Sequence, residues 1–413
     1  MAPSGPITTP LTTLLGIRHP IMLAGMAHTA GGELAAAVSN AGGLGVIGGF
    51  QYTPQQLRDM IDDMKARWER PNLPFGVDLA LPQVGGGARK TNHDYTHGKL
   101  DELVDLVIES GACLFVSAVG VPDRRVIDKL HRHGVLVMNM VGHPKHAVKA
   151  LDRGVDMVCG QGTEGGGHTG DVASSVLMPA IADGRLPLRL HRHGVLVMNM
   201  VGHPKHAVKA LDRGVDMVCG QGTEGGGHTG DVASSVLMPA IADVARRYRP
   251  PMLGGGPALV VAAGGIHNGR GLASSLMQGA VGVWVGTRFV ASAEAASSQE
   301  HKQAVVECGF SDTDRTLVLT GRPLRARLNP YLRAWAARGN AAQELCDRGV
   351  IPIEHDFEND VEDIEFPHIM GQVAGAITKI QPAREIVDEM VAEAVEQLRL
   401  ADAYLSPSSR SKL

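Results

Sequence analysis

The chain has 413 residues, 44% of them hydrophobic and only 4% aromatic, and its net charge is −4. This length allows one large domain or two ordinary ones. The small negative charge, without any basic block, argues against nucleic acid as a partner. No apolar run is long enough to cross a membrane, and the first residues lack the pattern of a signal peptide. The five scattered cysteines form no CxxC pair, which argues against a disulfide framework and a zinc cage.

Short apolar runs alternate with helix-like segments along most of the chain. The predicted strands are His19–Ala24, Leu44–Ile47, Phe75–Ala80, Cys113–Ala118, Val135–Met140, Val155–Cys159, Leu259–Ala263 and Gly282–Val285. The predicted helices between them are Gly32–Asn40, Pro54–Arg67, Leu100–Ser110, Pro122–His133, His143–Arg153, Leu177–Asp183 (or Leu237–Arg247) and Gly269–Gln278. Strict alternation of this kind predicts parallel strands joined by crossover helices.

A long exact repeat interrupts this pattern. Residues Leu130–Asp183 recur without a change as Leu190–Asp243, and a six-residue linker joins the two copies. Repeats that have coexisted for long diverge, so identity over this length indicates a very recent tandem event or an error in the gene model. Two copies are also too few for a stacked solenoid.

The fold prediction depends on how the repeat is counted. One copy gives eight β/α units and both copies give ten strands. Eight units over this length predict an α/β fold of the (β/α)8 TIM-barrel type, with a doubly wound sheet as the alternative. We expect only one copy in the barrel and the other extruded as a βαβ insertion, because loop closure costs grow slowly with length whereas a broken barrel exposes strand edges. We prefer the first copy for the barrel, since it is synthesised first and follows strand four directly.

The domain boundaries follow from this count. We place the barrel at residues 14–300, a lid of irregular, charged sequence at 301–370, C-terminal helices that return to the barrel at 371–405, and a flexible tail at 406–413. The tail ends in Ser411-Lys412-Leu413, the tripeptide that a peroxisomal import receptor reads. We therefore expect a peroxisomal protein in a eukaryote and a cytoplasmic one otherwise.

Glycines follow several of the predicted strands. These strand ends are Gly25-Met26, Gly264-Gly265 and Gly286-Thr287, together with Gln161 in the first copy and Gln221 in the second. In a barrel the carboxyl ends of the strands face the active site, and the ends of strands seven and eight often bind phosphate through backbone N–H groups. The pattern indicates a flat, phosphorylated cofactor, to which Arg288 could add positive charge.

One histidine stands in the glycine-rich stretch GQGTEGGGHTG of each copy, as His168 and His228. The surrounding glycines leave this side chain few packing partners, and an imidazole near neutral pH suits proton abstraction beside an electron-withdrawing group. Glu164 and its duplicate Glu224 could orient the ring or simply cap the next helix. The remaining histidines of the repeat have HxH and HxxH spacings with no cysteine nearby, so we predict no metal site.

Three groups of motifs resemble one family. PIMLAGM with AGGLGVIGG, then GTEGGGHTGD, then VVAAGGIHNGRGLA with GVWVGTRF are similar to the nitronate monooxygenase (2-nitropropane dioxygenase) family, most closely to its fungal members. The resemblance covers nearly the whole chain apart from the extra copy and its linker.

This resemblance implies a barrel with FMN at its mouth and His168 or His228 as the base that deprotonates a nitroalkane, with His168 preferred. The anionic nitronate would then reduce FMN, and molecular oxygen would react. By position, FMN would lie against these residues: Gly25, Met26, Asp78, Gln161 or Gln221, Gly264, Gly265, Gly286 and Thr287. Asp78 stands where many relatives have asparagine, and a carboxylate there puts the substrate and the redox potential in question.

Two other functions stay open at this point. The same motifs resemble FMN-dependent enoyl reductases, which act on thioesters with NAD(P)H, and fold likeness does not decide between them. A duplicated chain could also be a non-catalytic flavin binder or a misfolded product.

Overall fold

The computed structural model describes residues 5–26, 28–49, 52–80, 96, 98–119, 122–141, 157–160, 196–212, 215–250, 253–321 and 323–404. Within these residues ten strands form one parallel sheet, in the order β1-β11-β10-β8-β7-β6-β5-β4-β3-β2. The strands are β1 (Ile21–Leu23), β2 (Gly45–Gly49), β3 (Phe75–Ala80), β4 (Leu114–Val119), β5 (Leu136–Val141), β6 (Met157–Gly160), β7 (Leu196–Val201), β8 (Met217–Gln221), β10 (Leu259–Ala263) and β11 (Gly282–Val285).

The sheet closes on itself between its first and last strands. A parallel bridge joins Met22 to Leu44. The Leu23 N–H donates to the Leu44 carbonyl at 3.0 Å, and the Leu44 N–H donates to the Ile21 carbonyl at 2.9 Å. Closure leaves no open sheet edge, which is the property that distinguishes a barrel from a doubly wound sheet. The prediction of a parallel α/β barrel is therefore confirmed.

The prediction that one copy of the repeat is extruded is wrong. β5 and β6 come from the first copy, β7 and β8 from the second, and all four lie side by side in the sheet. Met138 pairs with Met157 across β5 and β6, and Met157 pairs with Leu196 across β6 and β7. An extruded βαβ unit would leave an apolar strand without backbone partners, whereas a wider barrel keeps every strand paired. The barrel thus has ten strands where the sequence predicted eight.

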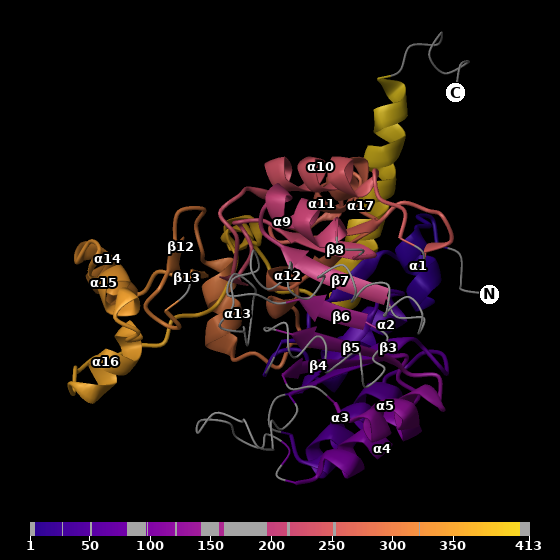
Figure 1. Cartoon of the computed structure of the whole chain (residues 1–413), viewed down its shortest axis with the longest axis horizontal. Coiled ribbons are helices and arrows are strands. Elements are labelled where there is room, and N and C mark those ends of the chain that lie inside the picture. Colours follow the sequence, from indigo (N-terminus) through magenta and orange to yellow (C-terminus); the bar gives the residue numbers. More distant parts are fainter. Residues whose placement is uncertain are drawn as a thin grey trace.

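Helices surround the barrel, as Figure 1 shows, with α3, α4 and α5 on one side of the strands and α9, α10 and α11 on the opposite side. The helices of this part are α1 (Pro10–Leu15), α2 (Gly32–Asn40), α3 (Pro54–Ala66), α4 (Leu100–Ser110), α5 (Arg124–His131), α9 (Pro204–Leu211), α10 (Ser234–Ala245), α11 (Gly269–Met277), α12 (Thr287–Val290) and α13 (Gln299–Val306). None of the helices in the described ranges is long and apolar enough to cross a membrane.

Alternate strand residues build two apolar layers. Outward residues such as Phe75, Phe115 and Val137 pack against the helices. Inward residues fill the barrel, and Met138 and Met198 do so from the same position of the two copies. This period of two is the signature of a strand that is buried on both faces.

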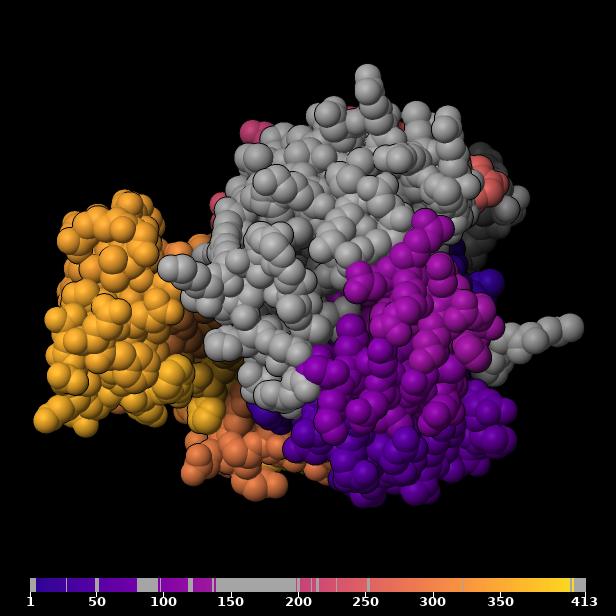
Figure 2. Space-filling model, turned by 60° about the horizontal axis from the view of Figure 1, so that its bottom comes forward, coloured from indigo at the N-terminus to yellow at the C-terminus, as the bar shows by residue number. Residues whose placement is uncertain are grey.

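A separate lobe stands off the barrel (Figures 1 and 2). It contains the hairpin β12 (Thr313–Thr316) and β13 (Leu324–Arg327), and the helices α14 (Pro330–Ala337), α15 (Ala341–Asp347) and α16 (Pro352–Glu358). Its small core is centred on the carboxylate of Asp356, which accepts hydrogen bonds from the Tyr331 hydroxyl and the Trp335 indole N–H, each at 2.9 Å. Burial, followed by the hydrogen bond to Asp356, raises the pKa of Tyr331 to about 12.

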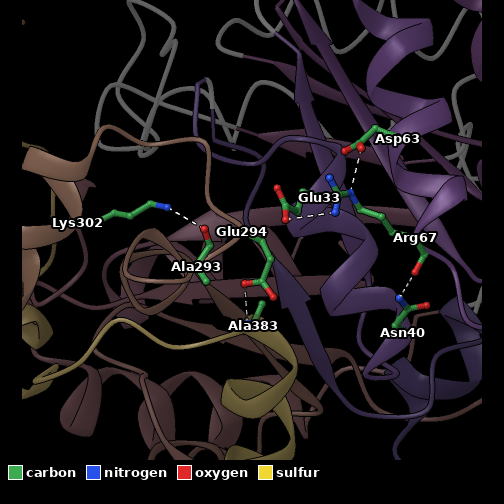
Figure 3. A network of polar contacts seen from close by, with 8 residues as sticks. All are labelled: Glu33, Asn40, Asp63, Arg67, Ala293, Glu294, Lys302 and Ala383. Atoms are coloured by element: carbon green, nitrogen blue, oxygen red, sulfur yellow. Dashed lines mark hydrogen bonds and ion pairs between the residues drawn. The ribbon is translucent and has the colours of Figure 1, made fainter.

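The chain then returns to the barrel through the 3-10 helix η2 (Gln372–Ala376) and the long helix α17 (Ala383–Ala403). Helix α17 packs against α11 and α2. Figure 3 shows how its start is held: the Glu294 carboxylate accepts a hydrogen bond from the Ala383 N–H at 2.8 Å, while nearby Lys302 donates to the Ala293 carbonyl at 3.0 Å. The predicted targeting residues Ser411, Lys412 and Leu413 lie outside the described residues.

Deletion of residues 130–189 tests whether the second pair of repeat strands is dispensable. The deletion joins Lys129 to Leu190, and because the copies are identical it yields the same protein as deletion of residues 184–243. β4 would then meet the same LVMNMV sequence that it pairs with in β5, so an eight-stranded barrel should close. We expect cooperative thermal unfolding by circular dichroism, with a midpoint at least as high as that of the full chain. An insoluble product would show that ten strands are required.

Candidate functional site

Four neighbouring strands end at the glycine-containing residues that were predicted from the sequence to face the active site. Gln221 of β8 pairs with Ala263 of β10, Ala263 pairs with Trp284 of β11, and Leu23 of β1 pairs with Val285 of β11. The residues that follow these strands therefore form one arc at the carboxyl end of the barrel, here called the glycine rim. The glycine rim consists of Gln221, Gly264, Gly265, Gly286, Thr287, Gly25 and Met26. All seven are half-buried, although the strands leading to them are almost wholly buried.

Asp78 joins this rim from β3. A Cβ atom on Gly25 would lie 2.7 Å from the Asp78 Oδ2 atom, so the end of β1 comes very close to this carboxylate. Gly48, which pairs with Asp78, is more strictly constrained, since its Cβ would lie 2.7 Å from the backbone nitrogen of Met26. The structure thus brings Asp78 close to Gly25 and Met26, three of the residues that the family resemblance assigns to the cofactor site.

Gly286 offers room of the kind that a flat ligand needs. A Cβ atom there would meet nothing nearer, among the described residues, than the Met26 Sδ atom at 3.6 Å and the Ala24 Cβ atom at 3.8 Å. The adjacent N–H groups belong to the first turn of α12, where helices have unpaired donors. These residues fit a phosphorylated, planar cofactor.

A cavity of about 350 Å³ adjoins the other end of the rim. Gly264 and Gly265 line it together with Glu224, His267 and Gln372, but Gly25, Asp78 and Gly286 do not. Burial, and then the positive charge of Arg288, lower the pKa of His267. The cavity therefore lies at the Gly264-Gly265 end of the rim.

The glycine-rich loop of the second copy, residues 221–231, lies directly against Gly264. The Gly222 N–H donates to the Ala263 carbonyl at 3.2 Å, and a Cβ on Gly264 would lie 3.1 Å from the Gly225 nitrogen. Gly264 also has a φ of +83°, which L side chains rarely adopt. This backbone contact exists because β8 is the neighbour of β10.

Glu224 caps a helix, which was one of the two roles left open for it. Its carboxylate accepts hydrogen bonds from the Ser234 N–H at 3.0 Å and from the Ser234 hydroxyl at 2.9 Å, at the start of α10. Its carbonyl accepts the Gln372 N–H at 2.9 Å, which ties the loop to η2. Glu224 is therefore committed to holding the loop's shape.

The backbone of His228 belongs to a two-residue strand, β9 (Gly227–His228). β9 is the third strand of an antiparallel sheet with the lobe's hairpin, where Leu324 of β13 pairs with His228 and Arg325 pairs with Gly227. The counterpart His168, and Gln161, lie outside the described residues.

The hydrogen bonds of Arg288 go to residues outside the rim, whereas the sequence suggested that this side chain could add positive charge to a cofactor site. Its side chain is buried and donates hydrogen bonds to the Gln381 Oε1 atom at 2.6 Å and to the carbonyls of Ala291 and Lys379 at 3.3 and 3.4 Å. Burial lowers the pKa of Arg288. The guanidinium thus connects α12 to the segment that leads into α17.

The lobe and the segment after it contribute contacts to the site that were not predicted from the sequence. Arg325 donates to the Thr223 carbonyl across 102 positions of sequence, and Gly371 donates to the Thr287 hydroxyl at 3.0 Å. Neither contact can be recognised from a local sequence pattern, because the sequence around residue 325 is charged and shows no regular helix or strand periodicity. In the described part of the chain, no group of three or more His, Cys, Asp and Glu side chains could hold a metal ion.

A family model described as nitronate monooxygenase matches residues 8–188 and residues 184–393. The two matches meet in the linker, so each contains one copy of the repeat. Among curated relatives, a Mycobacterium tuberculosis protein named for monooxygenase activity is 30% identical, covering 94% of this chain and 96% of its own. A Staphylococcus saprophyticus protein named for nitronate monooxygenase activity is 28% identical, covering 79% of this chain and 80% of its own.

Other relatives carry different names. A second Mycobacterium tuberculosis protein, 27% identical over 97% of this chain and 99% of its own, is named as a dehydrogenase of an octahydroindene carboxyl-CoA. The solved structure of FabK from Thermotoga maritima is 26% identical, with a TM-score of 0.59 over 97% of this chain and 100% of that one. Nitroalkane oxidase from Streptomyces ansochromogenes, at 22% identity and a TM-score of 0.57 over 94% of this chain and 99% of that one, shares the fold.

Arg288→Ala tests the structural role of this guanidinium. Loss of its buried hydrogen bonds should lower the free energy of unfolding by about 2–4 kcal/mol, measured by urea denaturation. The matched control is Arg270→Ala, which removes only an exposed ion pair with Glu393 and should cost less than about 1 kcal/mol. Equal effects of the two substitutions would contradict this assignment.

Proposed function

Since the chain belongs to the nitronate monooxygenase family, we propose that it binds FMN and uses it with molecular oxygen to oxidise nitronates and nitroalkanes. The chain is an oxidoreductase enzyme of this family and acts on small molecules. The observation that carries the finer proposal is the glycine rim: four adjacent strand ends with little side-chain bulk, beside a loop that contains one histidine.

The glycine rim would hold the cofactor. Gly264, Gly265, Gly286 and Thr287 offer backbone N–H groups suited to a phosphate, and Gly25, Met26, Asp78 and Gln221 flank the remaining part of the rim. When bound, FMN supplies an electron acceptor and the place where oxygen reacts. The Asp78 carboxylate beside Gly25 would disfavour additional negative charge at that end of the rim.

His228 would act as the base. Its imidazole would accept the proton from the carbon next to the nitro group; the C–H bond breaks, and the electron pair is delocalised onto the nitro oxygens to give the nitronate. We favour His228 over its duplicate because the loop around it contacts Gly264 and pairs with β13. His168 is the other candidate, as its sequence surroundings are identical.

Reduction of an unsaturated thioester by NAD(P)H is the second candidate function. The likeness to FabK and to a relative named for a carboxyl-CoA substrate favours it. The two functions can be distinguished by an experiment under anaerobic conditions. If our proposal holds, a nitronate should bleach the flavin absorbance of the purified protein. Bleaching by NADPH and not by a nitronate would favour the reductase and would contradict our proposal. A protein that purifies without flavin would favour a non-catalytic chain.

Gly286→Ala tests the cofactor position. The added methyl group would make only ordinary van der Waals contacts with the described residues, so the fold should survive. The methyl group would occupy the rim and weaken FMN binding by about tenfold or more. The readout is the flavin dissociation constant from fluorescence quenching, alongside the thermal midpoint without flavin. Gly31→Ala is the matched control, because its nearest neighbour would be the Ala296 Cβ atom at 3.8 Å. Unchanged flavin affinity in Gly286→Ala would rule out this position.

His228→Asn and His168→Asn, made separately, identify the base. We expect His228→Asn to lower the turnover of a neutral nitroalkane by about 100-fold or more, because proton transfer by a positioned base contributes that much. Turnover of the nitronate prepared in advance should change little, since its proton is already removed. His168→Asn should leave both rates near those of the parent. The reverse pattern would assign the base to the first copy.

A further inference from the structure

Arg325 is a buried charged residue, and its hydrogen bonds to the described residues include none to a carboxylate. Only 8% of the Arg325 surface is exposed to solvent. The Nε–H donates to the Thr223 carbonyl at 2.8 Å, and Nη1 donates to the Thr313 carbonyl and to the Thr313 hydroxyl, both at 3.1 Å. Burial lowers the pKa of Arg325. A buried guanidinium is costly, so the contacts that it makes need an explanation beyond packing.

A second arginine lies opposite the first. Arg315 pairs directly with Arg325 across the hairpin, and like charges in this arrangement destabilise a sheet. The Arg315 Nη2 atom donates to the Thr229 carbonyl at 3.5 Å. The two side chains therefore bind carbonyls on either side of His228, one at Thr223 and the other at Thr229. Two adjacent arginines are unfavourable for the hairpin itself. Their hydrogen bonds to the loop around His228 offset this cost and explain why both are present.

The backbone of the hairpin reaches the same loop. Arg325 pairs with Gly227 and Leu324 pairs with His228, while the Thr229 N–H donates to the Pro323 carbonyl at 3.4 Å. β13 has β12 on its other side, so it has a single edge to offer. Only one of the two identical glycine-rich sequences can pair with that edge, and in this structure the second copy does so.

We infer that Arg325 is a positioning residue, which holds residues 221–231 in the conformation that the proposed base His228 requires. This inference rests on the proposed function of His228 as the base. It also assigns a role to the lobe: β13 distinguishes two loops of identical sequence by pairing with the one that follows β8. Arg325 itself need not touch the substrate.

The test compares Arg325→Lys with Arg327→Lys on two substrates, a neutral nitroalkane and its nitronate prepared in advance. Lysine keeps the positive charge, but it lacks the planar guanidinium that donates to Thr223 and Thr313 at the same time. Arg327 lies two positions along the same strand and is the matched control. We expect Arg325→Lys to lower kcat for the nitroalkane by about 10- to 100-fold, since small misplacements of a base are costly. Its nitronate turnover and thermal midpoint should stay near those of Arg327→Lys.

Hydrogen–deuterium exchange gives a readout that does not depend on turnover or on flavin. The peptide must extend from the loop past Asp243, because only then does its sequence differ from that of the first copy. Faster exchange in Arg325→Lys than in Arg327→Lys supports the inference. Equal exchange, or an equal loss of turnover for both substrates, would overturn it.

The same experiment keeps the two proposals apart. If His228→Asn slows the nitroalkane selectively and Arg325→Lys does not, the inference about Arg325 fails while His228 remains the base. If His228→Asn has no selective effect, the proposed base is wrong, and the exchange measurement alone decides whether Arg325 holds the loop.

Discussion

Every parallel strand in this protein must find a backbone partner on both sides, and the rest of the structure depends on how that requirement is met. A strand inserted by duplication has only two choices, to pair or to stay unpaired with its polar backbone exposed. Here β5, β6, β7 and β8 all pair, and the bridge between Met22 and Leu44 still closes the sheet. The larger circumference is filled from inside by residues such as Met138 and Met198.

Strand order then decides which copy meets the candidate site. β8 is the neighbour of β10, so the loop after β8 lies against Gly264, and the same loop is within reach of the hairpin edge at β13. The loop is held on three sides by backbone contacts, from β10, from β13 and from Gln372. Two stretches of identical sequence thus have different surroundings, and only the surroundings separate their roles.

The lobe and the C-terminal segment stabilise the site without belonging to the barrel. The lobe has its own core around Asp356, which lets its hairpin remain ordered while it stands off the barrel. Arg288 fixes the segment before α17 through Gln381, and Glu393 of α17 caps α11 by accepting the Gly269 N–H at 2.7 Å. Elements that are distant in sequence therefore hold the two ends of the glycine rim.

The alternation of strands and helices and the positions of the strand ends can be read from the amino-acid sequence, because apolar runs followed by glycine are local signals. That was enough to place Gly25, Met26, Gly264, Gly265, Gly286 and Thr287 on one rim once a parallel barrel was assumed. The three-dimensional structure was needed to show that both copies enter the sheet, that Arg288 joins α12 to the segment before α17 and that Arg325 binds the loop. These outcomes depend on which strand edges and carbonyls lie nearby in space, and identical or irregular sequence carries no information about that.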